Sequence, residues 1–300
     1  MPPASALRFN KGIVVPVNEP FRLDLTADAL RRLAANVVDV VDDETYYRAF
    51  ADERGSAVVA VRQRDAGSIE VRSTGDAARF VPIVARMLGT QADLTQWYER
   101  TARIAWLHRL AVAFEGVKPP RYATLWEACA HAIVFQQISI HAAGSIMRRT
   151  IEALAARVVA GGVRCIPFPP PERWLTAGEE TLRAAGLSRN KVAHLRSVAA
   201  AFVEGAIDEV TLEKLPTPEA AERLRAIRGI GPWSAAVVLL RGMGRLDTFP
   251  LRDSGVARSI ALLAGETVDL DFVLETLGPV RGMLYYHLLL GRLRNHSARP

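Results

Sequence analysis

A short stretch in the last third of the chain combines two closely spaced glycines, a tryptophan and a single carboxylate. Residues 224–260 read LRAIRGIGPWSAAVVLLRGMGRLDTFPLRDSGVARSI, in which one residue separates Gly229 from Gly231, and Asp253 follows 22 residues later. Backbone amides at the start of a helix bind anions, and a fixed carboxylate can orient water or stabilise a developing positive charge. The spacing therefore predicts an anion-binding turn close to an acid.

The two glycines predict a tight turn between two helices. The first helix is expected to start after Thr217 and to run to about Arg228, where Gly229 takes the left-handed conformation that ends helices. Gly231 then closes the turn, and Pro232 opens the second helix. Because glycine has no side chain, a nucleic-acid backbone can approach such a turn closely. A helical hairpin that uses glycine only to turn is the alternative interpretation.

Asp253 directly precedes the helical segment SGVARSIALLAG, so the simplest role for its carboxylate is to cap that helix. Such a cap is worth about 1 kcal/mol. The residues between Gly231 and Asp253 consist of one helix and the loop 244–252, which can carry the chain away from the turn and back. We therefore also expect the carboxylate to lie beside the turn, where it is available for chemistry.

The charge of the chain points to a polyanionic partner for its second part. The 300 residues carry 38 basic and 32 acidic side chains, a net charge of +6. Residues 1–100 hold 13 basic and 14 acidic side chains, whereas residues 101–300 hold 25 and 18. A basic excess confined to one part of a chain is typical of nucleic-acid binding. Basic helix faces that are simply solvated would give the same numbers.

The composition excludes several classes of protein. No apolar run approaches the roughly 18 residues that span a bilayer, and the first residues lack the apolar core of a signal peptide. Two cysteines, Cys129 and Cys165, are too few for a disulfide framework or an all-cysteine metal site. A cytoplasmic protein with no membrane partner is expected.

Hydrophobic periodicity divides the chain into an α+β part and an all-α part. Residues 1–92 are expected to form a small N-terminal domain, and residues 93–300 a helical region of nine or ten helices with no sheet. The elements expected in the first part are a strand at 21–25, a helix at 26–41, an antiparallel meander of strands at 46–50, 56–64 and 68–73, and a closing helix at 75–88.

The pattern G-[IV]-G-x-[WK]-[ST]-A, followed after about twenty residues by D-x-x-[IV]-x-R, occurs here at 229–235 and 253–258. It resembles the signature of the helix-hairpin-helix base-excision DNA glycosylases. Further segments resemble the alkylation-repair branch of that family, the 3-methyladenine DNA glycosylase II type; they are residues 44–63, 135–146, 168–199 and 277–290. The resemblance implies a small N-terminal antiparallel β-sheet domain followed by two all-α subdomains, with the helix-hairpin-helix at about 217–243 and a catalytic Asp loop at 247–255.

The resemblance also implies a reaction. Such enzymes flip a nucleotide out of the duplex and hydrolyse the N-glycosidic bond of alkylated, cationic purines such as 3-methyladenine. Bifunctional relatives carry a lysine that attacks the sugar where this chain has Trp233. The only lysines are Lys11, Lys118, Lys191 and Lys214, and none follows residue 214. A monofunctional enzyme without lyase activity is therefore expected.

Roles for individual residues follow from the resemblance. Asp253 is expected to stabilise the oxocarbenium-like sugar, and Trp233, Tyr286 and Leu289 are expected to line the base pocket, with the electron-rich face of Trp233 attracting a cationic base. The residues expected to contact DNA are Gly229, Gly231, Ser234, Arg258 and the two candidates for a wedge in the base stack, Gln136 and Gln137.

The resemblance implies no organic cofactor and no catalytic metal, but a structural Na⁺ or K⁺ ion on the backbone carbonyls of Arg228 and Ile230. The expected partner is double-stranded DNA with alkylated bases, bound by a monomer at the nucleoid. Two alternatives stay open. One is a non-catalytic protein that binds damaged DNA through the same hairpin. The other is a glycosylase for oxidised or deaminated bases.

Overall fold

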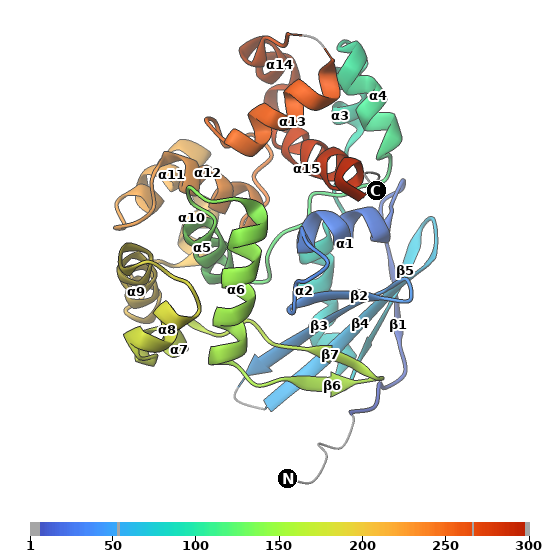
Figure 1. Ribbon diagram of the computed structural model, residues 1–300. Coiled ribbons are helices and arrows are strands. Elements are labelled where there is room, and N and C mark those ends of the chain that lie inside the picture. The colour runs from blue at the N-terminus through green and yellow to red at the C-terminus, as the bar shows by residue number, and fades with distance from the viewer. Residues whose placement is uncertain (1–6, 53–54, 266, 298–300) are drawn as a thin grey trace.

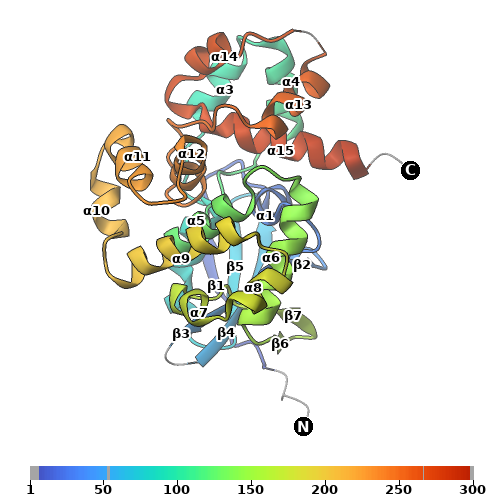
Figure 2. The same ribbon diagram turned by 60° about the vertical axis from the view of Figure 1, so that its left-hand side comes forward.

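A computed structural model describes residues 7–52, 55–265 and 267–297 of the chain. A five-stranded sheet near the N-terminus and two groups of helices build the molecule, as Figures 1 and 2 show from two directions. No helix in the described ranges is long and apolar enough to cross a membrane. Both cysteines are buried and free.

All neighbouring strands of the sheet are antiparallel, and their order is β1-β5-β4-β3-β2. The strands are β1 (Ile13–Pro16), β2 (Asp39–Asp42), β3 (Thr45–Asp52), β4 (Gly55–Asp65) and β5 (Ser68–Ser73). Helix α1 (Leu23–Arg31) precedes β2, and α2 (Ala77–Leu88) follows β5 and packs on it. The expected meander and closing helix are confirmed as β3, β4, β5 and α2.

Two expectations for residues 21–41 are wrong. Residues 23–25 begin helix α1 instead of forming a strand, and residues 39–41 belong to β2 instead of the helix. The run FRLDL is too short to show whether its hydrophobic residues follow the two-residue period of a strand or the 3.6-residue period of a helix. Burial decides: Leu23, Thr26, Ala27 and Leu30 share the inner face of α1, so Thr26 lies inside the helix and does not cap it.

A third expectation, that no sheet follows residue 92, is also wrong. Strands β6 (Val158–Ala160) and β7 (Val163–Cys165) form a hairpin that packs on β3 and β4. Its turn consists of Gly161 and Gly162, both with positive φ. Two such glycines between short runs of valine are a hairpin signal that the helical periodicity on either side concealed.

Two groups of helices make up the rest of the described chain. The first contains α5 (Leu125–Val134), α6 (Ile140–Leu154), α7 (Pro171–Thr176), α8 (Glu179–Ala184), α9 (Arg189–Val203), α10 (Glu209–Lys214), α11 (Thr217–Arg225) and α12 (Pro232–Arg241). The second contains α3 (Thr95–Thr101), α4 (Ala105–Ala113), α13 (Ser254–Ala264), α14 (Leu270–Leu277), the 3₁₀ turn η1 (Gly278–Val280) and α15 (Gly282–Ser297). The described chain thus has more helices than expected, because several are too short to show a period.

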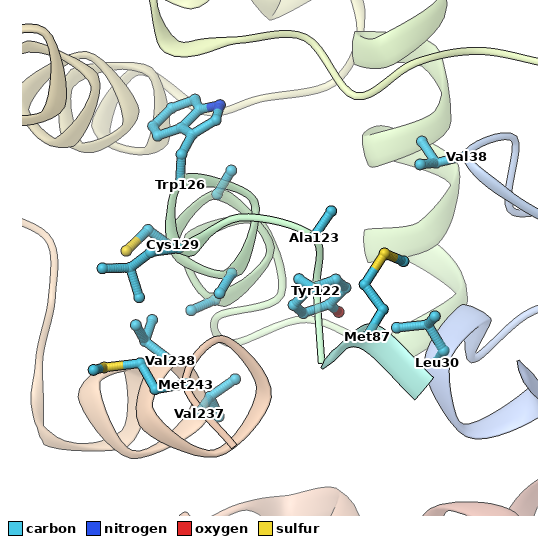
Figure 3. Packing of buried hydrophobic residues seen from close by; sticks show 14 of the residues in the cluster. Leu30, Val38, Met87, Tyr122, Ala123, Trp126, Cys129, Val237, Val238 and Met243 are labelled. Carbon is cyan, nitrogen blue, oxygen red and sulfur yellow. The ribbon is translucent and has the colours of Figure 1, made fainter. Parts of the chain in front are cut away.

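The sheet and the first helical group share one hydrophobic core, in which every residue of α5 is buried. Figure 3 shows Trp126 and Cys129 of α5, with Val238 of α12 and Met243 lying below Cys129. The second helical group has a core of its own. Helix α1 contributes to both cores, through Leu30 to the first and through Leu25 to the second. It therefore connects the N-terminal sheet to the two helical groups.

A buried ion-pair cluster joins the sheet to α5. Arg48 of β3 lies 2.6 Å from Asp39 and 2.5 Å from Glu127, and all three side chains are almost fully buried. The hydroxyl of Tyr46 donates a further hydrogen bond to Asp39. Burial raises the pKa of Glu127 to about 7, although the charge of Arg48 acts in the opposite direction. The cluster fixes α5, and with it the loop that follows α5, against the sheet.

We expect Arg48→Met to lower the free energy of unfolding by about 3–5 kcal/mol, because it leaves two buried carboxylates without their cation. Guanidinium unfolding followed by circular dichroism measures the change. The matched control is Arg62→Met on β4, which removes an exposed arginine 3.8 Å from Glu44 and should cost at most about 1 kcal/mol. Equal stability of the two variants would contradict the structural role given to the cluster.

Candidate active site and nucleic-acid interface

Helices α11 and α12 form the expected hairpin. Helix α11 begins at Thr217 and ends at Arg225, slightly earlier than expected, and the amide of Ile230 donates to the carbonyl of Ile227 in the turn. Gly229 has a φ of 101°, and a Cβ on it would lie 2.6 Å from the Cβ of His194. Both the backbone conformation and the close packing therefore require glycine at this position.

Gly231 differs from Gly229 because nothing inside the protein requires it to be glycine. Its φ of −88° suits any residue, it is exposed, and a Cβ on it would meet no atom within 4 Å. It is the N-cap of α12, whose first residue is Pro232. The amides of the first turn of α12 therefore begin beside an open surface, where the helix dipole favours an anion.

The residues after α5 are tied to the hairpin. Nε2 of Gln136 donates to the carbonyl of Gly229 at 3.0 Å and to the hydroxyl of Ser234 at 2.7 Å. Nζ of Lys191 donates to the carbonyls of Val134 and Gln136. Gln136 is thus half-buried with its side-chain amide bonded to the hairpin, an arrangement that favours Gln137 over Gln136 as the wedge. Ser234 is almost fully buried, and its hydroxyl accepts the hydrogen bond from Gln136, so its side chain is engaged inside the protein.

Gln137, in contrast, is exposed and has a φ of 58°. This left-handed conformation is uncommon for a residue with a side chain. The neighbouring Ile138 is 39% exposed, and Ser139 then caps α6 by accepting from the amide of Ala142. Gln137 and Ile138 both lie at the mouth of a cleft, so this loop presents an amide and an apolar side chain next to the hairpin.

The cleft has a volume of about 510 Å³ and is formed by the loop after α5, the start of α12, the start of α13 and one face of α15. Phe135, Trp233, Asp253, Tyr285 and Leu289 line it. Volumes of this order suit a small-molecule ring such as a purine. Segments from both helical groups thus meet around one cavity.

Three hydrogen bonds hold the carboxylate of Asp253. Oδ1 accepts from the amides of Gly255 at 2.7 Å and Val256 at 3.1 Å, so Asp253 caps α13, as expected from the sequence. Oδ2 accepts from Nε1 of Trp233 at 3.0 Å. Among the described residues no ion pair includes Asp253. The carboxylate is therefore fixed in position while its charge remains available to a group that enters the cleft.

Two of the three residues expected in the base pocket line the cleft, and the third does not. Trp233 and Leu289 line the cleft, but Tyr286 does not, and this expectation is wrong. The Tyr286 side chain is fully buried, and its hydroxyl donates to the carbonyls of Pro120 and Leu240. Successive residues of a helix point about 100° apart, so the neighbouring Tyr285 faces the cleft instead.

Sequence reasoning missed most of the charge in the cleft. Its lining contains four arginines, which are Arg32, Arg252, Arg258 and Arg292. Of these only Arg258 was expected, and it is exposed. The sequence could have predicted the contribution of α15 to the cleft, because Tyr285, Leu289 and Arg292 recur at helical spacing. It could not have predicted Arg32, because this residue follows α1 and no local pattern connects α1 to the site.

The hairpin, the fixed carboxylate at the start of the next helix and the cleft between two helical groups lie together, as the resemblance found in the sequence predicts. The model of the HhH-GPD superfamily of base excision DNA repair proteins matches residues 130–269. The match covers a little less than half of the chain, and over that segment, which contains the hairpin and Asp253, the chain is similar to this superfamily.

Individual relatives with curated names are also similar to the chain. The chain is 30% identical to a DNA-3-methyladenine glycosylase of Bacillus subtilis over 57% of its own length and 56% of the relative's. It is 26% identical to DNA-3-methyladenine glycosylase 2 of Escherichia coli over 72% of its length and 75% of the relative's. It thus spans only about half the length of the Bacillus relative. The fold is that of a 3-methyladenine DNA glycosylase from Archaeoglobus fulgidus, with a TM-score of 0.79 and 24% identity over 94% of this chain and 99% of that one.

We expect Gly229→Ala to destabilise the protein by about 2 kcal/mol or more, because the positive φ of the turn is strained for a residue with a Cβ and the new Cβ meets His194. Gly231→Ala is the matched control, two residues away, and should leave the midpoint of thermal unfolding close to that of the wild type. Differential scanning calorimetry measures both. A stable Gly229→Ala variant would show that the turn can relax and that glycine is not required for the fold.

Proposed function

We propose that the chain is a monofunctional DNA glycosylase that flips alkylated purines, such as 3-methyladenine, out of double-stranded DNA and hydrolyses their N-glycosidic bond. The observation that carries the proposal is the carboxylate of Asp253, fixed by Trp233 and two backbone amides, in a cleft beside the hairpin. The similarity to curated DNA-3-methyladenine glycosylases supports the choice of alkylated bases.

Contacts with the DNA backbone are assigned to the hairpin and the cleft mouth. The amides at the start of α12 suit a phosphate oxygen, and the absence of a side chain at Gly231 leaves room for it. Arg252 and Arg258 are exposed at the cleft, where they suit neighbouring phosphates. Gln137 is the wedge candidate that remains, because it is exposed beside the cavity that would take the flipped base.

The proposed chemistry uses Asp253 and water. As the bond between base and sugar lengthens, positive charge grows on the sugar, and a fixed carboxylate nearby stabilises it. Oδ1 is occupied by two amides, whereas Oδ2 has only the N–H of Trp233 and keeps a lone pair for the sugar or for the attacking water. Because these hydrogen bonds exist before the reaction, the acid needs little rearrangement in the transition state.

The absence of an amine at the site supports hydrolysis over lyase chemistry. A lyase needs a nucleophilic amine that attacks the sugar. No lysine is among the described residues that line the cleft. Lys191, which lies nearest to the loop after α5, donates its amine hydrogens to two backbone carbonyls.

A monovalent cation at the hairpin also suits the residues present. The carbonyls of Ile227 and Gly229 accept hydrogen bonds. The carbonyls of Arg228 and Ile230 accept none within the described chain, and carbonyl oxygens are suitable ligands for Na⁺ or K⁺. Such an ion would lie between the turn and a phosphate. Since one chain supplies the whole cleft, we propose that the protein acts as a monomer on nucleoid DNA.

The test is a duplex methylated with dimethyl sulfate, with released bases separated by liquid chromatography. We expect the wild type to release 3-methyladenine and to leave strands that break only after alkali. Asp253→Asn should lose about 100-fold or more in the rate of release, with DNA affinity retained. Gly231→Ala is the contrasting control: it should weaken DNA binding, with the release rate recovered at saturating enzyme.

Three results would overturn the proposal. Full activity of Asp253→Asn would assign the chemistry to a group other than this acid. Release of oxidised bases or uracil, but not of methylated bases, would assign a different glycosylase. Strand breaks without alkali would mean lyase chemistry.

The hydrogen bond between Trp233 and Asp253 has its own test. Trp233→Phe keeps an aromatic face in the cleft and removes the N–H, so we expect single-turnover base release to fall about 10-fold to 100-fold. Trp174→Phe is the matched control, because it removes an indole N–H bonded to the carbonyl of Pro169 in the core, away from the cleft. An unchanged rate in Trp233→Phe would mean that the two backbone amides alone position the acid.

A further inference from the structure

Arg32 brings a cation from the N-terminal domain into the cleft. It is the C-cap residue that follows α1, it is only 6% exposed, and it lines the cavity that contains Asp253. Its φ of 62° is unusual for a residue other than glycine. No ion pair of the described residues includes Arg32. A buried arginine without a carboxylate partner is costly, so its retention here requires another explanation.

Two aromatic residues fix the direction of the Arg32 guanidinium. Nη2 donates to the hydroxyl of Tyr285 at 2.8 Å, and the guanidinium carbon lies 4.9 Å from the centre of the Phe135 ring. Both aromatic residues line the same cleft. Nε is fully buried without a partner, and within the described residues the Arg32 side chain makes a hydrogen bond only through Nη2. The side chain is thus held in one orientation with donors left over.

The other three arginines of the cleft have different surroundings. Arg252 and Arg258 are exposed and suit phosphates. Arg292 is half-buried against the start of α13, since a Cβ on Gly255 would lie 2.7 Å from its Nη1. Burial lowers the pKa of Arg32, but the oxygens of Tyr122, Tyr285 and Asp253 outweigh this effect, so the group stays charged. Arg32 is therefore the buried donor whose partner is missing.

We propose that Arg32 determines specificity by donating a hydrogen bond from Nη1 to a carbonyl oxygen of the flipped base. The proposal rests on the glycosylase function proposed above and narrows its substrates. N-alkylated guanines present the O6 acceptor, whereas N-alkylated adenines present an amino group at the same ring position. A guanine would satisfy Arg32, and an adenine would leave it unpaired. A site built around a polar partner discriminates strongly against a base that lacks it.

One methylated duplex supplies the matched substrates. Treatment with labelled dimethyl sulfate gives 3-methyladenine, 3-methylguanine and 7-methylguanine, all of which are cationic in DNA. 3-Methyladenine and 3-methylguanine share the position of the methyl group, but guanine has a carbonyl at the 6-position and an amino group at the 2-position. The 2-amino group cannot accept a hydrogen bond from Arg32, so the change in the ratio on removing the Arg32 donor reports on the carbonyl. The measurement is the rate of release of each base from the same DNA, for the wild type and for Arg32→Met.

We expect Arg32→Met to lower the release of both methylguanines about 10-fold or more relative to 3-methyladenine, as for the loss of a charged hydrogen-bond donor. Arg258→Met is the control, because it removes an exposed arginine of the same cleft; it should slow all three bases equally. A purely structural role for Arg32 would also slow all three equally. The ratio therefore separates a role in reading the base from a role in folding.

Two further variants keep the test valid if Arg32→Met does not fold. Arg32→Lys keeps the charge but loses the planar group, and Tyr285→Phe removes the hydroxyl that orients Arg32. Both should shift the ratio in the same direction, by less. An unchanged ratio in every folded variant overturns the inference, as does a wild type that releases 3-methyladenine but neither methylguanine. If the wild type releases none of the three bases, the proposed function itself is wrong.

Discussion

The hydrogen bond from the indole of Trp233 to the carboxylate of Asp253 joins the starts of two helices that belong to different cores. Helix α12 packs mainly in the core shared with the sheet, with Leu240 reaching the second core, and α13 packs in the second core. A hydrogen bond of 3.0 Å tolerates little relative movement of its partners. The geometry of the acid therefore depends on how firmly the two helical groups are held together.

The N-terminal domain contributes to that rigidity. Helix α1 places Leu30 in one core and Leu25 in the other, and Arg48 fixes β2 and β3 to α5 through buried carboxylates. Arg241 of α12 reaches back to donate to the carbonyls of Ala29 and Leu30. The domain is thus part of the structure that positions the cleft, and through Arg32 it also supplies part of the lining.

The sequence predicted the parts of the site that depend on local backbone geometry. Gly229 needs a positive φ, and Asp253 caps a helix, so each has a pattern that can be recognised within a few residues. The meander was predictable for the same reason. The orientation of Gln136 and the choice between Tyr285 and Tyr286 depend on which neighbour covers each helix face. Arg32 depends on a contact between distant segments, and no local pattern encodes it.

The positive charge of the cleft affects the proposed selection of a cationic base. An aromatic face attracts a cation by about 0.5–2 kcal/mol, whereas two like charges 4 Å apart near a protein surface repel by about 4 kcal/mol. Trp233 alone would not offset Arg32 and Arg292. In the proposed reaction, however, positive charge leaves the base and appears on the sugar. The arginines then raise the free energy of the bound cationic substrate, while Asp253 lowers the free energy of the transition state. Both effects lower the activation barrier.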